Sequence, residues 1–215
     1  PCTQDYTDAV IDMYKNENPM AIHGYSPSLG IESVRKTVAE SLNRRFGMDY
    51  ETKHIFMAIG AAGALAHAFR LVTQPGDEII VFAPFFPEYH EYIGRTGAVM
   101  RVVPANTETF QINFEAFEET LNEKTMAVLI NTPNNPSGIA YSTETIKKLA
   151  AIMEAKQKEY GHDIFLISDE PYRELAYGGV EVPFVTKYYH NAVVGYSYSK
   201  SLSVPGERIG YVVIP

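Results

Sequence analysis

Short apolar runs rich in β-branched residues alternate along this chain with longer amphipathic stretches. The runs predict strands at His54–Ile59, Glu78–Phe82, Val99–Val103, Met126–Ile130, Ile164–Ser168, Val193–Tyr196 and Ile209–Ile214. The amphipathic stretches between them predict helices over Gly30–Arg45, Gly63–Val72, Pro87–Arg95, Asn113–Asn122 and Ser142–Tyr160. This alternation favours an α/β fold, with a mostly parallel mixed sheet of about seven strands and helices on both faces.

Composition limits the classes of function. The chain has 215 residues with 46% hydrophobic residues, enough for one sizeable core but tight for two full domains. A formal net charge of -8 without a basic patch argues against nucleic acid or an anionic membrane as a partner. The single cysteine, Cys2, excludes an internal disulfide and fits a cytoplasmic location. A small-molecule ligand is therefore the expected partner.

The two ends of the chain predict a piece of something longer. The chain begins on proline without an initiator methionine, and it has neither a basic start nor an apolar segment typical of a signal peptide. Its last residues, YVVIP, belong to a predicted buried strand. No run is long and apolar enough to predict a transmembrane helix. We expect residues 1–215 to form one domain.

Two turns after predicted strands offer ligand contacts. In AIGAAGALAHAF, the small residues Gly60–Gly63 open a helix whose free N–H groups favour an anion such as phosphate. A merely tight turn is the alternative. In APFFPEY, two prolines fix Phe86 where its ring can stack on a flat heteroaromatic ligand. A core phenylalanine is the alternative there.

Two further turns carry amide and carboxylate groups. NTPNNPSG, residues 131–138, forms a rigid turn that can fix an amide over the sheet edge. In ISDEPYREL, Asp169 follows an apolar strand directly, where a carboxylate is costly unless it has a cationic or N–H partner. A helix-capping aspartate is the alternative for Asp169. The six histidines are scattered, so a metal site is not expected.

The stretch YSYSKSLSVPGERIG combines residue types that one cofactor needs. Ser197, Ser199 and Arg208 are phosphate-binding types, and Lys200 is the side chain that forms a Schiff base with an aldehyde. Pyridoxal phosphate needs a lysine for its aldehyde, a cup for its phosphate and a carboxylate for its pyridine nitrogen. All three are present in turns expected to meet at one sheet edge.

These motifs, in this order, resemble those of the class I/II aminotransferases, the aspartate aminotransferase relatives among fold-type-I pyridoxal-phosphate enzymes. The resemblance implies that Lys200 holds the cofactor as a Schiff base and then moves a proton during catalysis. It also implies that Asp169 holds the ring nitrogen, that Tyr172 and Asn135 bind the phenolic oxygen, and that Phe86 stacks on the ring. The implied phosphate ligands are Ala61, Ala62, Ser197, Ser199 and Arg208.

The resemblance carries expectations about assembly and extent. Tyr25, in YSPSLG, resembles a tyrosine that reaches the neighbouring subunit's cofactor phosphate, which implies a homodimer; its position alone predicts a buried aromatic before a helix. Cis peptide bonds are expected at Ala83–Pro84 and Asn135–Pro136. Where many relatives have a hydroxyl residue in the first phosphate turn, this chain has Gly60, Ala61 and Ala62. Relatives also have a small carboxy-terminal domain and an amino-terminal arm, which we expect this chain to lack.

The expected function is amino-group transfer between an amino acid and a 2-oxo acid. The cofactor residues are shared with other reactions on the same scaffold, so a β-lyase, a decarboxylase or a cyclopropane-forming synthase stays open. A cofactor-sensing domain of a transcription regulator is the alternative outside enzymes, although no DNA-binding segment is visible in the sequence. The motifs do not name the amino donor or acceptor.

Overall fold

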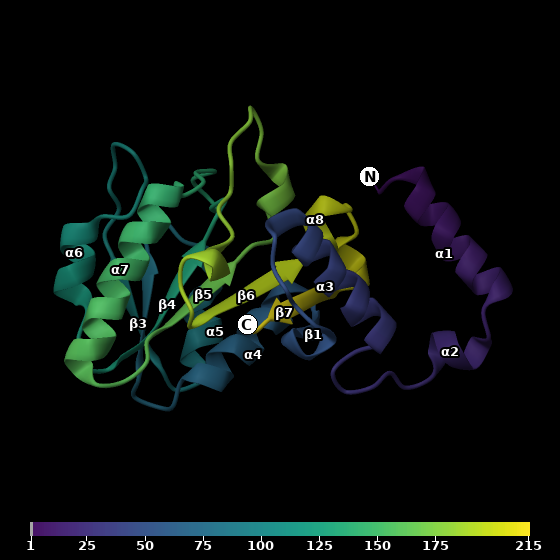
Figure 1. Cartoon of the computed structure of the whole chain (residues 1–215), viewed down its shortest axis with the longest axis horizontal. Helices are drawn as coiled ribbons and strands as arrows, with labels where there is room; N and C mark the ends of the chain where they lie inside the picture. Colours follow the sequence, from purple (N-terminus) through teal and green to yellow (C-terminus); the bar gives the residue numbers. More distant parts are fainter. Residues whose placement is uncertain (1) are drawn as a thin grey trace.

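Seven strands form one mixed sheet in the computed structural model, which describes residues 2–215. The sheet order is β1-β7-β6-β5-β4-β2-β3 (Figure 1). Strands β2 to β6 pair in parallel, whereas β7 runs antiparallel to both β1 and β6. The expected fold class is confirmed, with strand ends within one residue of those predicted. The strands are β1 Ile55–Ile59, β2 Glu78–Phe82, β3 Val99–Val103, β4 Thr125–Asn131, β5 Phe165–Asp169, β6 Ala192–Ser197 and β7 Ile209–Val213.

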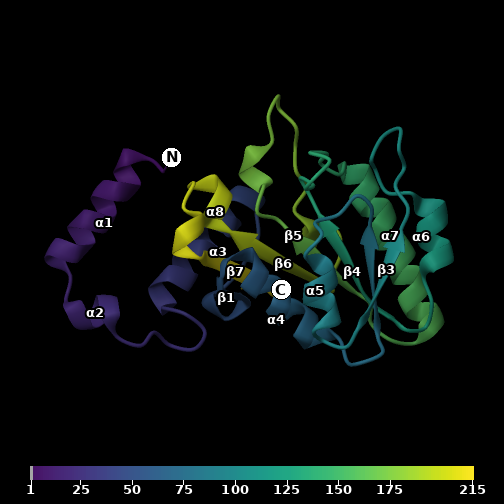
Figure 2. The same cartoon turned by 180° about the vertical axis from the view of Figure 1, so that it is seen from behind.

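Helices cover both faces of this sheet (Figures 1 and 2). On one face, α4 Gly60–Val72 and α5 Tyr89–Gly94 pack on a core that includes Ala127 and Leu129 of β4. The opposite face carries α3, α6 and α7, with Val128 and Ile130 of the same strand. Alternate residues of β4 therefore enter different cores, which explains why this strand is a continuous apolar run. The latter helices span Glu32–Phe46, Phe114–Thr120 and Thr143–Tyr160.

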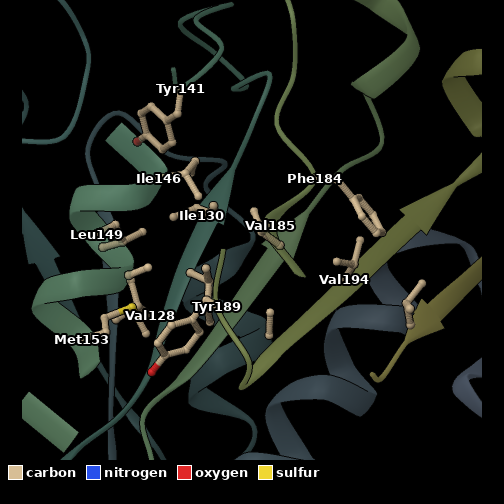
Figure 3. Packing of buried hydrophobic residues seen from close by; sticks show 14 of the residues in the cluster. Val128, Ile130, Tyr141, Ile146, Leu149, Met153, Phe184, Val185, Tyr189 and Val194 are labelled. Atoms are coloured by element: carbon tan, nitrogen blue, oxygen red, sulfur yellow. The ribbon is translucent and has the colours of Figure 1, made fainter. Parts of the chain in front are cut away.

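The core between α7 and β4 joins residues at the 3.6-residue repeat of a helix with residues at the two-residue repeat of a strand. Ile146, Leu149 and Met153 repeat every three or four residues on one side of α7 and are fully buried. They pack against Val128 and Ile130 of β4 (Figure 3). Burying such side chains contributes about 1.5 to 3 kcal/mol each. This packing holds the middle strands rigid, and their carboxyl ends carry the candidate site.

The amino-terminal segment contains two helices that the sequence did not predict. These are α1 Gln4–Asn16, capped by Thr3, and α2 Pro19–His23, capped by Asn18. Neither helix has a buried residue, and both views show them apart from the sheet (Figures 1 and 2). In α1, Tyr6, Val10 and Met13 recur at helical spacing, but none of these side chains is buried.

Short elements complete the chain. A four-residue helix, α8, spans Tyr198–Ser201. The expected cis bonds at Ala83–Pro84 and Asn135–Pro136 are confirmed, and a third is present at Thr132–Pro133. Within residues 2–215, no helix combines the length and apolar character that a bilayer crossing requires. The 3-10 helices are η1 Thr52–His54, η2 Arg173–Leu175, η3 Val185–Lys187 and η4 Pro205–Glu207.

Candidate active site

The predicted site residues meet in one pocket at the carboxyl edge of the sheet. Strands β1, β2, β4, β5 and β6 all point the same way, so the turns that follow them converge there. The segment before β7 reaches the same edge because β7 runs the opposite way. The pocket has a volume of about 340 Å³. Ten of the eleven predicted residues line it: Ala61, Ala62, Phe86, Asn135, Asp169, Tyr172, Ser197, Ser199, Lys200 and Arg208.

Asp169 ends β5 with a carboxylate that is only 5% exposed. Its Oδ2 accepts a 2.6 Å hydrogen bond from the phenol of Tyr89, whereas its Oδ1 is buried and has no partner among the described residues. Burial raises the pKa of Asp169 to about 7, the Tyr89 hydrogen bond lowers it, and the nearby Glu170 raises it. Its hydrogen bond comes from a phenol, so the alternative of a helix cap does not describe it. Asp169 is one of the residues that line the pocket, and its unpartnered oxygen can accept an N–H.

Asn131 holds two of the site's loops together. It ends β4 beside Asp169 in the parallel register, and its side chain is almost fully buried. Its Nδ2 donates to the Asp169 carbonyl at 2.9 Å, and its Oδ1 accepts from the Asn135 backbone N–H at 2.7 Å. We did not single out Asn131 from the sequence. The feature that could have identified Asn131 is an amide side chain at the end of one strand beside a carboxylate at the end of the neighbouring strand.

Asn135 and Tyr172 form a polar pair on the pocket wall. Burial raises the pKa of the Tyr172 phenol, the nearby Asp169 raises it further, and a hydrogen bond with the Asn135 side chain lowers it. The phenol therefore stays protonated at neutral pH and can donate a hydrogen bond. The expected adjacency of these two motifs is present in the structure.

The opposite end of the pocket is built for an anion. Gly60 begins α4 with φ +69°, and a Cβ there would lie 2.6 Å from Nη2 of Arg208. Only glycine lets the arginine approach the first turn of this 13-residue helix so closely. The Ser197 hydroxyl accepts the Ser199 N–H at 3.1 Å and also bonds the Ser199 hydroxyl at 2.8 Å. The helix N-terminus, the hydroxyls and the guanidinium together favour a phosphate.

Lys200 lies between these two ends on α8. Its side chain is exposed, and its Nζ sits 5.7 Å from the centre of the Tyr172 ring. It forms no salt bridge with any residue of the described range. An amine in this position can reach a ligand carbonyl without first breaking an ion pair.

Several pocket residues were not predicted. Phe86, which was predicted, is half-buried: it lines the pocket, packs against the core and meets Tyr89 edge to face at 5.7 Å. Tyr92 donates a hydrogen bond to Glu88, and burial together with that carboxylate raises its pKa to about 12. The periodicity of α5 is that of an ordinary core helix, so the sequence did not indicate that Tyr92 lines a pocket. The unpredicted lining residues are Leu65, Glu88, Tyr92, Asn131, Pro171 and Pro205.

Tyr25 does not lie in this pocket. The prediction that it is a buried aromatic is wrong, because its side chain is fully exposed in the loop between α2 and α3. This loop runs from α2, which stands apart from the sheet, back to α3 (Figure 1). An exposed ring of this kind has no packing role within one chain. The described residues also contain no group of three or more metal-ligating side chains placed to hold an ion.

Comparisons with known proteins agree with this geometry. The chain is 34% identical over 196 residues to a probable aspartate/prephenate aminotransferase of Aquifex aeolicus, covering 89% of this chain and 48% of the relative. It is 31% identical over 196 residues to an aspartate aminotransferase of Geobacillus stearothermophilus, with 89% and 48% covered. The chain thus spans about half the length of the curated relatives it matches.

Solved structures give the same result. An amino transferase from Eubacterium rectale superposes with a TM-score of 0.99 at 50% identity, covering all of this chain and 54% of that one. The aspartate aminotransferase of Thermus thermophilus with maleate gives 0.89 at 27% identity, again with 54% of its length covered. The family model of aminotransferase class I and II matches residues 2–215. The chain belongs to the aminotransferase class I and II family.

Proposed function

We propose that residues 1–215 form the pyridoxal-phosphate-binding domain of an amino-acid aminotransferase. Members of the class I and II family use pyridoxal phosphate as their cofactor. The observation that carries the proposal is the buried, unpartnered Oδ1 of Asp169 in the pocket that also presents Lys200 and Arg208. One pocket thereby offers an acceptor for a ring N–H, an amine for an aldehyde and a cation for a phosphate.

The residues present fit this cofactor. An unpaired buried carboxylate oxygen costs free energy, and a cationic ring N–H placed against Oδ1 of Asp169 relieves that cost. Arg208, Ser197 and Ser199 would bind the phosphate with the first N–H groups of α4 at Ala61 and Ala62. Because those two residues have no hydroxyl, the Ser197 and Arg208 side chains carry more of the phosphate binding.

When bound, pyridoxal phosphate supplies an aldehyde and an electron-withdrawing ring that makes the substrate Cα–H acidic. Asp169 would keep the ring nitrogen protonated, which its carboxylate does by favouring the charged ring. Lys200, once its amine is free, would take the proton from the substrate Cα and return it at the cofactor carbon that carried the aldehyde. Tyr172 and Asn135 would donate to the phenolic oxygen, and Phe86 would hold the ring plane.

The proposed substrates are an amino acid and a 2-oxo acid. Relatives are named for aspartate and prephenate, but the residues described here do not select a donor. The proposed assembly is a homodimer in which the Tyr25 hydroxyl would reach the phosphate in a second copy of the chain; the full exposure of Tyr25 within one chain supports this proposal. A cytoplasmic location stays a prediction from the single cysteine.

A single half-reaction tests this function. The protein is loaded with pyridoxal phosphate, mixed with a donor amino acid and analysed without an acceptor. Transamination predicts one 2-oxo acid formed for each pyridoxamine phosphate. Pyruvate with ammonia, or carbon dioxide with an amine, would instead support the lyase or decarboxylase reactions that share these cofactor residues.

A further inference from the structure

We propose that Glu174 is a positioning residue that fixes Lys200 relative to Tyr172. The inference rests on the proposed function, since it concerns how the amine of Lys200 is presented to an aldehyde. Glu174 does not line the pocket. It lies in η2, the turn that begins directly after Tyr172, and η2 packs against α8, which carries Lys200. Any bond between these two elements sets the spacing of the two pocket residues.

The Glu174 carboxylate bonds residues of two other elements and connects to α8 through one of them. Its Oε1 accepts from Nη2 of Arg45, at the end of α3, at 2.6 Å. Its Oε2 accepts from the phenol of Tyr196, on β6, at 2.7 Å. The same phenol lies 2.8 Å from Oγ of Ser201, the last residue of α8. A phenol has one proton, so Ser201 donates to Tyr196 and Tyr196 donates to Glu174.

This chain of hydrogen bonds matters because α8 has only four residues. A helix so short does not hold its shape by its own backbone bonds. At its start, the Ser197 hydroxyl accepts the Ser199 N–H. At its end, Ser201 bonds Tyr196. Lys200 therefore lies between two hydroxyl hydrogen bonds, and Glu174 orients the Tyr196 phenol that forms the second.

Neighbouring rings hold the side chain of Tyr196 in place. Its ring is 3% exposed, stacks on Tyr211 at 4.9 Å and meets Tyr198 edge to face at 5.2 Å. Burial raises the pKa of Tyr196, and the hydrogen bond to Glu174 raises it further, so the phenol stays a donor at working pH. Arg45 balances the carboxylate charge, with side chains 37% and 29% exposed for Arg45 and Glu174. Glutamine at position 174 cannot accept from both Arg45 and Tyr196 through two oxygens.

Two ligands separate positioning of Lys200 from a general effect on the pocket. Pyridoxal phosphate has an aldehyde that the lysine captures, whereas pyridoxamine phosphate has the same ring and phosphate but no aldehyde. If Glu174 positions Lys200, Glu174→Gln should slow capture of pyridoxal phosphate about tenfold, because a small misplacement of a reacting group costs rate steeply. The Kd of pyridoxamine phosphate should stay unchanged.

The experiment measures capture by borohydride quenching at set times and peptide mapping of Lys200, alongside pyridoxamine phosphate binding. Ser201→Ala removes only the terminal hydroxyl and should slow capture in the same direction, which keeps the test valid if Glu174→Gln folds poorly. Glu159→Gln is the matched control, because Glu159 pairs with Lys156 at 2.8 Å on the surface of α7. Unchanged capture in both folded variants, or an equal loss of pyridoxamine phosphate affinity, would overturn the inference. A wild-type chain that binds neither compound contradicts the proposed function itself.

Discussion

Replacing Asp169 with asparagine should make the cofactor-free chain more stable at alkaline pH than the wild type. The wild-type carboxylate is buried, has one unpartnered oxygen, and has a pKa raised from 3.8 to about 7. Between these values the unfolded chain has lost the proton while the folded chain keeps it. The group therefore lowers the free energy of unfolding as pH rises from about 4 to about 7. Asparagine has no such titration and still accepts the Tyr89 hydrogen bond through its oxygen.

The magnitude follows from linkage. At about pH 5 the folded wild type still holds the proton, and by about pH 8 the full cost of ionising the buried group is present. The two pH units between 5 and the folded pKa correspond to ~3 kcal/mol at 1.36 kcal/mol per unit. The free energy of unfolding of Asp169→Asn should exceed its wild-type value by ~3 kcal/mol more at pH 8 than at pH 5. Differences in packing between the two side chains cancel, because they are the same at both pH values.

Urea unfolding of both cofactor-free proteins at the two pH values measures this difference directly. Contributions from titrating groups that do not interact with Asp169 are common to both chains and cancel as well. The same substitution should abolish tight pyridoxal phosphate binding, because the ring nitrogen loses its carboxylate. Parallel pH profiles for the two proteins would refute the reasoning, since Asp169 would then ionise as easily in the fold as in water.

Three further substitutions test other parts of the site. Tyr89→Phe removes the hydrogen bond that lowers the pKa of Asp169, so that pKa should rise. The acid side of the pH profile for cofactor affinity should therefore shift to higher pH by about one to two units, as measured by cofactor titration across pH. Arg208→Ala should weaken pyridoxal phosphate binding about tenfold or more while leaving unphosphorylated pyridoxal unaffected; equal losses for both ligands would contradict a phosphate role. Tyr25→Phe should leave the Tm of the cofactor-free protein unchanged, because the ring is fully exposed, but should speed cofactor loss from the assembled protein. A lowered Tm of the cofactor-free protein would show instead that the Tyr25 hydroxyl forms a bond within its own chain.

Much of the fold could be predicted from local pattern. Strand β4 is apolar throughout because alternate residues such as Val128 and Leu129 enter different cores, and such runs are plain in a sequence. Turn chemistry identified the small residues Gly60–Gly63 at the opening of α4, although the helix begins at Gly60 and not at the predicted Gly63, and it identified Asp169 at the end of β5. Both positions depend on neighbours in the chain, which a sequence displays directly.

What escaped prediction depends on contacts between distant residues. The bond from Tyr89 to Asp169 spans 80 positions, and the phenol is presented by a helix whose spacing looks like ordinary core. The antiparallel placement of β7 between β1 and β6 left no local signature. Tyr25 was expected to be buried because it is aromatic, but its exposure depends on where the loop between α2 and α3 runs in space.

The central claim is that Lys200 captures pyridoxal phosphate in a pocket closed by Asp169 and Arg208. The direct test is an absorbance titration of the purified chain with pyridoxal phosphate, followed by borohydride reduction and peptide mapping. The claim predicts a saturable, pH-sensitive band and a single modified peptide that carries the cofactor on Lys200. No band, or cofactor scattered over surface lysines, would contradict it.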